Sequence, residues 1–159
     1  MNWIAELQNL GLVVTAGGLG AVIGLEREIH DKPAGLRTHI FVSAASALLV
    51  VLADSMVHTF GQHSAEVTRA DPTRIVQAIV VGISFLGAGT ILHHGGNRVE
   101  GLTTAASILL TAVVGIAVAL EHLVLAAGTT LFAVLVLALL GRVQQHFKAD
   151  DATPSDLAR

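Results

Sequence analysis

The sequence GISFLGAGTILHHGGNRVEGLTTAA, residues 82–106, decides the class of fold. It begins inside an apolar run, crosses a short polar turn and re-enters apolar sequence through Gly101, Leu102, Thr103 and Thr104. Clustered small residues allow membrane helices to approach closely, and threonine hydroxyls bond to carbonyls or to a ligand. The stretch therefore predicts either a close-packed helix seam or the wall of a polar path through a membrane.

The composition favours a membrane protein. Of the 159 residues, 53% are hydrophobic and 13% are charged, and the mean hydropathy is +0.71. Soluble domains carry about 25% charged residues, so a water-facing surface would be hard to cover. The net charge of −3 argues against a nucleic-acid partner, which requires a basic patch. Because cysteine is absent, disulfides and thiolate metal sites are excluded.

Apolar runs divide the chain into five expected helices. Residues 102–140 would form one helix of about 58 Å, nearly twice the hydrocarbon core of about 30 Å, so the chain is expected to fold back at Glu121 and His122. We predict an all-α polytopic membrane protein, with a five-helix transmembrane domain over residues 1–141 and a short polar tail over 142–159. The expected spans are 4–25, 38–57, 74–92, 102–120 and 123–141.

The distribution of Lys and Arg predicts the orientation. With five spans, seven basic residues share the side of the first linker, the third linker and the tail, and only Arg69 and Arg74 lie on the other side. Basic residues collect in cytoplasmic segments. The C-terminus is therefore expected in the cytoplasm and the N-terminus outside.

Small residues predict where helices come close. Gly20 and Gly24 form a GxxxG pair, and Ser84 with Ala88 repeats the spacing later in the chain. We expect these faces to be contact seams, either within the bundle or between copies. The complete set of predicted helix-packing residues is Gly20, Gly24, Gly82, Ser84, Gly87, Gly89 and Gly101.

Asp54 interrupts the second apolar run. A charged side chain at the centre of a membrane helix costs about 2.5–3.5 kcal/mol on insertion scales. Asp54 is therefore either an ion ligand or proton carrier within the membrane, or it lies at the outer interface, where Ser55 and His58 indicate that the helix surfaces. The sequence leaves both interpretations open.

Two further groups of polar residues are candidates for a functional cluster. Glu26, Arg27 and Arg37 flank the first linker. They either anchor it at the interface, or Arg37 or Arg27 pairs with Glu26 or Glu100 where the helices converge and closes the cytoplasmic side. Asn97 and Glu100 lie in the turn before Thr103 and Thr104, as a solvent-exposed connector or as part of a polar cluster at a helix N-terminus. Asp71 and Arg74 complete the candidates, with Asp71 as the expected cap of the third helix.

No catalytic motif is present. The sequence has no GxSxG, HExxH, P-loop or GxGxxG pattern, and adjacent His93 and His94 point in different directions on a helix without a second pair to support a metal site. We therefore expect no enzymatic activity, no catalytic residue, no cofactor and no metal ligands.

Several strings resemble the MgtC/SapB family of bacterial inner-membrane proteins over residues 11–140. They are GAVIGLERE (20–28), AGLRTH (34–39), DPTR (71–74), FLGAG (85–89) and VEGLTTAA (99–106). The chain departs from the family pattern at Ala78, Ser84 and Leu109, where glutamine, glycine and tryptophan are common, and it resembles a short form without the soluble C-terminal domain. Matching these motifs to the family pattern implies a set of important positions, which are Gly24, Glu26, Arg27, Arg37, Asp71, Arg74, Gly87, Gly89, Gly101, Thr103 and Thr104.

The resemblance implies a multi-pass protein of the bacterial inner membrane, associated with survival in low magnesium and, in pathogens, inside macrophages. It implies regulation of other membrane proteins, including the proton-translocating ATP synthase. Our expectation is a regulator that contacts lipid and other membrane proteins through its helix faces. The alternative is a small oligomeric cation transporter or channel, lined by Asp54, Thr103, Thr104 and the linker charges and built as a homo-oligomer.

Overall fold

The computed structural model describes residues 3–61, 73–94 and 98–150. Within these ranges the chain forms five helices and one short hairpin, which confirms the prediction of an all-α fold built on five helices. The elements, in chain order, are α1 (Trp3–Ile29), α2 (Leu36–Gly61), α3 (Thr73–Gly89), β1 (Leu92–His94), β2 (Arg98–Glu100), α4 (Leu102–Ala119) and α5 (Leu123–Asp150).

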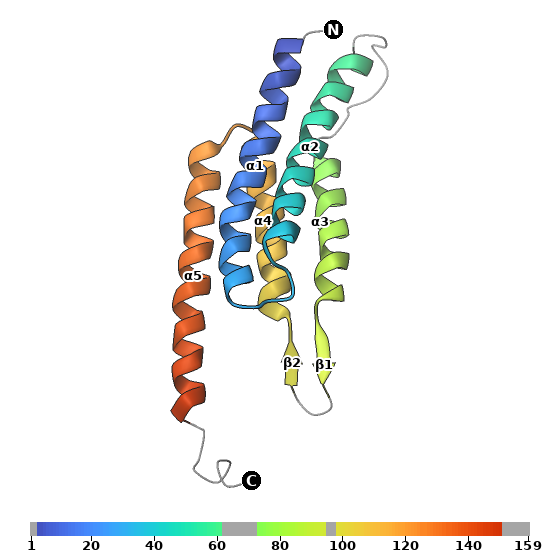
Figure 1. The fold of residues 1–159 in the computed structure, drawn as a ribbon. Helices are drawn as coiled ribbons and strands as arrows, with labels where there is room; N and C mark the ends of the chain where they lie inside the picture. The colour runs from blue at the N-terminus through green and yellow to red at the C-terminus, as the bar shows by residue number, and fades with distance from the viewer. Residues whose placement is uncertain (1–2, 62–72, 95–97, 151–159) are drawn as a thin grey trace.

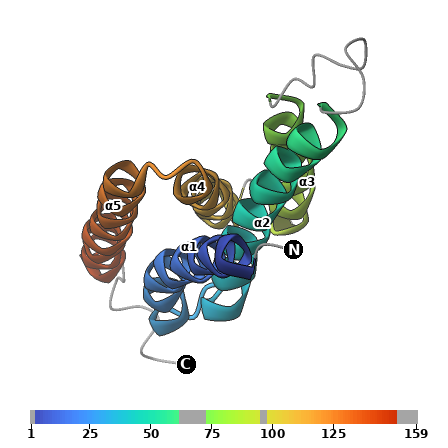
Figure 2. The ribbon, with the colours of Figure 1, turned by 90° about the horizontal axis from the view of Figure 1, so that it is seen from above.

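Successive helices run in alternating directions, so α1, α3 and α5 point one way and α2 and α4 the other (Figure 1). The α1–α2 loop and the β-hairpin consequently lie at the same end of the bundle, and the α4–α5 turn lies at the opposite end. Viewed along the bundle, α5 and α3 stand at opposite edges, with α1, α2 and α4 between them (Figure 2).

The outward surface is apolar along most of the bundle. Large hydrophobic side chains are exposed on every helix, among them Val14 on α1, Phe41 on α2, Phe85 on α3 and Val124 on α5. Four segments are long and apolar enough to cross a membrane: Trp3–Ile29, Leu36–Val57, Leu102–Ala119 and Leu123–Gly141. The chain is a multi-pass membrane protein, and its exposed apolar side chains face lipid.

Helix α3 is shorter than the predicted third span. Its 17 residues end at Gly89, and the chain then enters β1 instead of continuing as a helix to residue 92. At 1.5 Å per residue, 17 residues extend about 25 Å, which lies at the lower end of the usual spanning length. Helix α5, in contrast, continues past the end of the predicted span at residue 141 to Asp150.

Glycines bring the backbones of α1 and α2 into contact. A Cβ atom added at Gly20 would meet the carbonyl oxygen of His39 and lie 2.8 Å from Ser43 Cβ. One added at Gly24 would lie 2.8 Å from Leu36 Cα. Close approach of this kind is what small residues at helical spacing permit in membrane bundles.

Helix α4 is the central element of the bundle. It packs against each of the other four helices, and two apolar clusters meet on it. Val114 and Val118 belong to the cluster shared with α1 and α5, while Ile108 and Ala112 belong to the cluster shared with α2 and α3. Gly115 lets the carbonyl oxygen of Ser43 on α2 approach α4 where a side chain would block it. A displacement of α4 would therefore change the packing of the other four helices.

The strand pairing between α3 and α4 does not follow from the sequence pattern, which predicts only a short polar turn there. β1 and β2 pair antiparallel, with Leu92 opposite Glu100 and His94 opposite Arg98. Gly101 follows with φ of 92°, a left-handed conformation that glycine adopts without steric cost. Its missing side chain also leaves room for the carbonyl oxygen of Thr90. The hairpin thus returns the chain directly into α4.

Candidate functional site

Buried polar side chains gather where α1, α2 and α4 meet, at the end of the bundle that carries the α1–α2 loop. We call the side chains of Glu26, Arg27, His39, Thr104 and Ser107 the polar cluster. Each of these residues is at most 9% exposed. Ionisable residues inside a membrane bundle are costly and mark functional sites by default, so this cluster is the candidate site.

Arg27 connects α1 to α4. Its Nη2 atom donates a hydrogen bond of 3.3 Å to Thr104 Oγ1, and its Nη1 atom lies 3.8 Å from Glu26 Oε2. Thr104 lies in the first turn of α4, where backbone N–H groups are oriented towards the helix N-terminus. Among the pairings expected for the linker charges, the structure brings Arg27 and Glu26 together.

Glu26 also contacts the last turn of its own helix. Its Oε1 atom lies 3.2 Å from Nδ1 of His30. His30 Nδ1 in addition approaches the backbone oxygen of Glu26 at 2.8 Å, so the imidazole closes over the carboxylate. His30 is 32% exposed, whereas Glu26 is 9% exposed. His30 is therefore more exposed than the buried carboxylate that it contacts.

His39 connects α2 to α4. Its Nδ1 atom lies 3.0 Å from the carbonyl oxygen of Gly35, which can only accept, so Nδ1 carries a proton. Its Nε2 atom lies 3.3 Å from Ser107 Oγ. The Ser107 hydroxyl donates to the carbonyl oxygen of Thr104 at 2.8 Å. Thr104 therefore accepts two hydrogen bonds: Arg27 donates to its hydroxyl, and Ser107 donates to its carbonyl oxygen.

Three buried polar atoms have no hydrogen-bond partner within the described residues. They are Glu26 Oε2, Arg27 Nε and Ser43 Oγ. Unsatisfied buried polar atoms are few in folded proteins, and two of these three belong to adjacent, oppositely charged side chains. Glu26 Oε2 can accept a further hydrogen bond, and Arg27 Nε and Ser43 Oγ can each donate one.

The other predicted polar residues do not join the polar cluster. Arg37, Asp54, Arg74, Glu100 and Thr103 are exposed. Asp54 lies near the C-terminal end of the candidate span Leu36–Val57, and both interpretations of this residue stay predictions. Asp71 and Asn97 lie outside the described residues.

The predicted packing glycines fall into two sets. Gly20, Gly24 and Gly87 are buried, and a Cβ atom on Gly87 would lie 3.3 Å from Ala105 Cβ on α4. Gly82 and Gly89 lie on the exposed part of α3, where an added Cβ atom would meet nothing within 4 Å. Ser84 is also exposed, and its hydroxyl donates to the carbonyl oxygen of Val80 on the same helix.

Sequence reasoning missed His39, Ser43 and Ser107. A signal was present in the spacing of polar residues: His39, Ser43 and Ser46 recur at intervals of four and three on α2. Thr104, Ser107 and Thr111 recur at intervals of three and four on α4. Such spacing places each set on one helix face. Two polar stripes in otherwise apolar helices indicate a shared buried contact.

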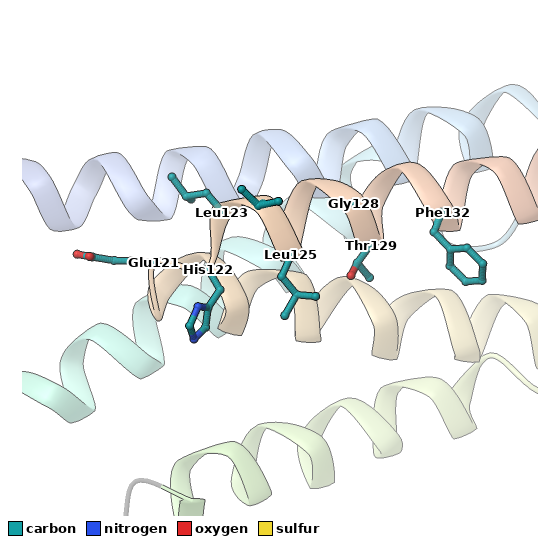
Figure 3. A pocket seen from close by; sticks show the side chains of 8 residues that line it. Glu121, His122, Leu123, Leu125, Gly128, Thr129 and Phe132 are labelled. Atoms are coloured by element: carbon teal, nitrogen blue, oxygen red, sulfur yellow. The ribbon is translucent and has the colours of Figure 1, made fainter.

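A groove lies at the other end of the bundle. An open groove of about 670 Å³ follows the α4–α5 turn and the first turns of α5, with Glu121 and His122 at one end and Phe132 at the other (Figure 3). Val124 in this groove is 90% exposed. The groove belongs to the lipid-facing surface. Over the described part of the chain, no three His, Cys, Asp or Glu residues gather in a way that could hold a metal ion.

Comparison with known sequences places this architecture in a family. Residues 13–146 match the MgtC family. The chain belongs to the MgtC family. This match confirms the resemblance drawn from the sequence motifs. The MgtC family is a family of membrane proteins and not an enzyme family.

Curated relatives within the MgtC family come from several bacteria. Protein MgtC of Brucella abortus is 42% identical over 140 residues, 88% of this chain and 54% of the relative. Protein SapB of Bacillus subtilis is 34% identical over 117 residues, 74% of this chain and 50% of the relative. YhiD of Escherichia coli K12, named "Putative magnesium transporter YhiD", is 41% identical over 107 residues, 67% of this chain and 48% of the relative.

These matches cover about half the length of the curated relatives. No solved structure matches this chain significantly. The polar cluster lies within the matched region of the MgtC family, because residues 26 to 107 all fall inside residues 13–146.

Proposed function

We propose that this MgtC family protein spans the bacterial inner membrane five times, with the N-terminus outside and the C-terminus in the cytoplasm. The alternating helix directions support five crossings (Figure 1). The excess of Lys and Arg in the first linker, the third linker and the C-terminal segment supports a cytoplasmic location for that end. The short helix α3 makes the third of these crossings, and its 17 residues reach the lower limit of spanning length.

The proposed role is in magnesium or cation homeostasis and adaptation to low magnesium, through regulation of other membrane proteins such as the ATP synthase. The MgtC family membership supports this role. The name of the relative YhiD, which connects that protein with magnesium transport, supports the link to the cation.

The observation that carries a regulatory mechanism is the outward face of α3. This helix stands at the edge of the bundle and packs mainly on α4. Its buried residues are Ile79, Ile83 and Gly87. Gly82 and Gly89, on the exposed part, have no neighbour within 4 Å of an added Cβ atom. Small residues in an exposed membrane helix allow a partner helix to approach its backbone, so α3 is the proposed contact.

The test is capture of the partner by variants of the exposed glycines. Gly82→Leu and Gly89→Leu are expected to reduce photo-crosslinking to a partner helix at least about ten-fold, since a leucine side chain prevents close backbone approach. Gly128→Leu on α5 is the matched control, because Gly128 is equally open. Crosslinking that is unchanged in both α3 variants, or reduced equally in the control, contradicts the proposal.

Gly24 and Gly87 are unsuitable for this test, although the sequence alone would single them out. Both lie against the chain's own helices, so a leucine there disturbs the bundle before it disturbs any partner. The loss of partner capture in such variants would not separate association from folding.

The alternative function is that of a small oligomeric cation transporter or channel. The observation in its favour is the buried polar cluster between α1, α2 and α4, with Thr104 at its centre. Purified protein in proteoliposomes would then move Mg²⁺, Na⁺, K⁺ or H⁺ down a gradient, and Asp54→Asn or Thr104→Val would reduce the flux. Absence of flux for all four cations removes this alternative.

A further inference from the structure

The groove at the α4–α5 turn has a polar end and an apolar lining. Glu121 and His122 lie at its polar end, and the exposed side chains of Leu125 and Phe132 line it along α5. Gly128 in the lining has no side chain, and an added Cβ atom there would meet nothing within 4 Å. The volume of about 670 Å³ lies in the range of small-molecule sites. The groove therefore suits a ligand with one polar and one apolar part.

The depth of the groove in the membrane follows from the candidate span of α5. This span runs from Leu123 to Gly141, and its 19 residues extend about 28 Å, close to the hydrocarbon thickness of about 30 Å. Leu123 therefore lies at the edge of the hydrocarbon region, and Glu121, which precedes the span, lies at the level of the lipid head groups. From Glu121 to Phe132 the groove extends about 16 Å into the apolar region (Figure 3).

Glu121 gives the polar end of the groove a negative charge. Its side chain is exposed, and Figure 3 shows it extending beyond the turn, away from Phe132. Two backbone hydrogen bonds hold the turn: Glu121 N–H donates to the carbonyl oxygen of Val118 and His122 N–H to that of Ala117, both at 2.9 Å. The carboxylate is thus attached to a fixed turn, where it attracts a cation and repels an anion.

We propose that this groove binds one phospholipid whose head group carries a primary ammonium. The ammonium donates charge-assisted hydrogen bonds to the Glu121 carboxylate, and one acyl chain lies along the apolar lining from Leu125 to Phe132. The phosphate then lies near the first turn of α5, where Leu123 and Val124 line the groove and where the first N–H groups of the helix attract anions. A lipid with an anionic head group lacks the ammonium and is repelled by Glu121.

A lipid fits this groove better than a second copy of the chain. The polar end and the apolar lining follow the order of head group and acyl chain in a bilayer, and Val124 in the lining is 90% exposed on the lipid-facing surface. In a symmetric pair of copies packed through this end of α5, the two Glu121 carboxylates would lie at the same membrane level and repel each other.

Photo-crosslinking tests the proposal in lipid nanodiscs of equimolar phosphatidylethanolamine and phosphatidylglycerol with the same acyl chains. Each lipid in turn carries a diazirine in one acyl chain, and peptide mapping by mass spectrometry locates the crosslinks. Crosslinks within residues 121–132 should come from phosphatidylethanolamine at least about three-fold more often than from phosphatidylglycerol, the effect of one ion pair near a surface. Around Val14, on the exposed face of α1, the two lipids should crosslink equally.

Two carboxylates provide matched variants for recognition of the head group. Glu121→Gln keeps the shape of the side chain but removes the charge, and the two lipids should then crosslink equally within residues 121–132. Glu6→Gln is the control, because Glu6 is an exposed carboxylate in the first turn of α1, which begins at the same end of the bundle. A preference that survives Glu121→Gln, or that falls equally in Glu6→Gln, overturns the role of Glu121.

A variant of Gly128 tests the groove itself. Gly128→Leu places a side chain in the lining and should lower the crosslinking of phosphatidylethanolamine within residues 121–132 by about five-fold, because the leucine occupies the space of the acyl chain. Gly18→Leu on α1 is the control, since Gly18 is likewise open, and it should leave these crosslinks unchanged. Unchanged crosslinking in Gly128→Leu overturns the groove as the binding site.

Equal crosslinking of the two lipids to residues 121–132 of the unaltered chain would show ordinary lipid contact and overturn the proposal. Crosslinks between copies of the chain at these residues, in place of lipid, would also overturn it. Lipid crosslinking at α5 does not depend on capture of a partner through α3, so the lipid site and the proposed regulatory function fail separately.

Discussion

Arg27 on α1 donates a 3.3 Å hydrogen bond to the hydroxyl of Thr104 on α4, a residue 77 positions later in the chain. The adjacent residue, Thr103, is exposed. Two neighbouring threonines of the same motif thus have different roles. One accepts from a buried guanidinium, and the other lies on the surface of the first turn of α4.

The two threonines provide a matched pair of variants. Thr104→Val keeps the shape of the side chain but leaves the Nη2 group of Arg27 without its acceptor, and we expect a loss of about 1–3 kcal/mol in the free energy of unfolding. Thr103→Val should change it by less than about 0.5 kcal/mol. Unfolding of both variants in mixed micelles measures the difference. Equal effects would show that the buried hydroxyl is not a structural acceptor.

Gly24 and Gly18 differ in the same way on α1. Gly24→Ala places a Cβ atom 2.8 Å from Leu36 Cα, and overpacking of this kind costs about 1–3 kcal/mol. Gly18→Ala meets nothing within 4 Å and should be neutral or stabilising by up to about 1 kcal/mol, because alanine favours the helix. The Gly24→Ala protein should therefore unfold at a lower temperature than the Gly18→Ala protein. A Gly24→Ala protein as stable as the Gly18→Ala protein would argue against the α1–α2 contact.

Gly101 is required by backbone conformation. At φ of 92°, a residue with a side chain is strained by about 1–2 kcal/mol, and the added Cβ atom would also meet the carbonyl oxygen of Thr90. Gly101→Ala should therefore destabilise the hairpin and increase amide hydrogen exchange in β1 and β2. Gly89→Ala, at an open position of α3, is the comparison, and exchange that rises equally in both variants would contradict the assignment.

Glu28 holds the start of α2. Its Oε2 atom accepts a hydrogen bond of 2.9 Å from the backbone N–H of Leu36, which satisfies one of the free N–H groups in the first turn of a helix. Glu28→Ala should cost about 0.5–2 kcal/mol in stability, as the loss of a helix cap does. Glu28→Gln retains an acceptor oxygen and should recover most of this loss. If both variants lose the same amount, the carboxylate acts through its charge.

The sequence predicted the number of helices and the fold-back at residues 121–122, because apolar runs and polar breaks follow directly from the cost of placing charges in lipid. It also selected Glu26, Arg27 and Thr104. It could not predict that Thr104, and not Thr103, faces Arg27, since the choice depends on how α4 is rotated about its axis. Rotation is set by contacts on all sides, here through Gly115 and Ser43.

Two other features depend on geometry that apolar length does not encode. The predicted third span continued to residue 92, but α3 ends at Gly89 because the chain pairs as a hairpin before α4. His39 was overlooked because the length of an apolar run does not show which polar residue at its start is buried. Its burial follows from Gly24, whose missing side chain admits His39 Cβ to the α1–α2 contact.

The backbone contact at Gly20 and Gly24 restricts how the bundle can change shape. Peptide groups, unlike side chains, have no alternative rotamers with which to absorb a displacement, so α1 and α2 can slide or rotate against each other only by separating. Any rearrangement on binding a ligand or a neighbour is therefore expected in α3 and α5, at the two edges of the bundle, while α1 and α2 keep their relative position.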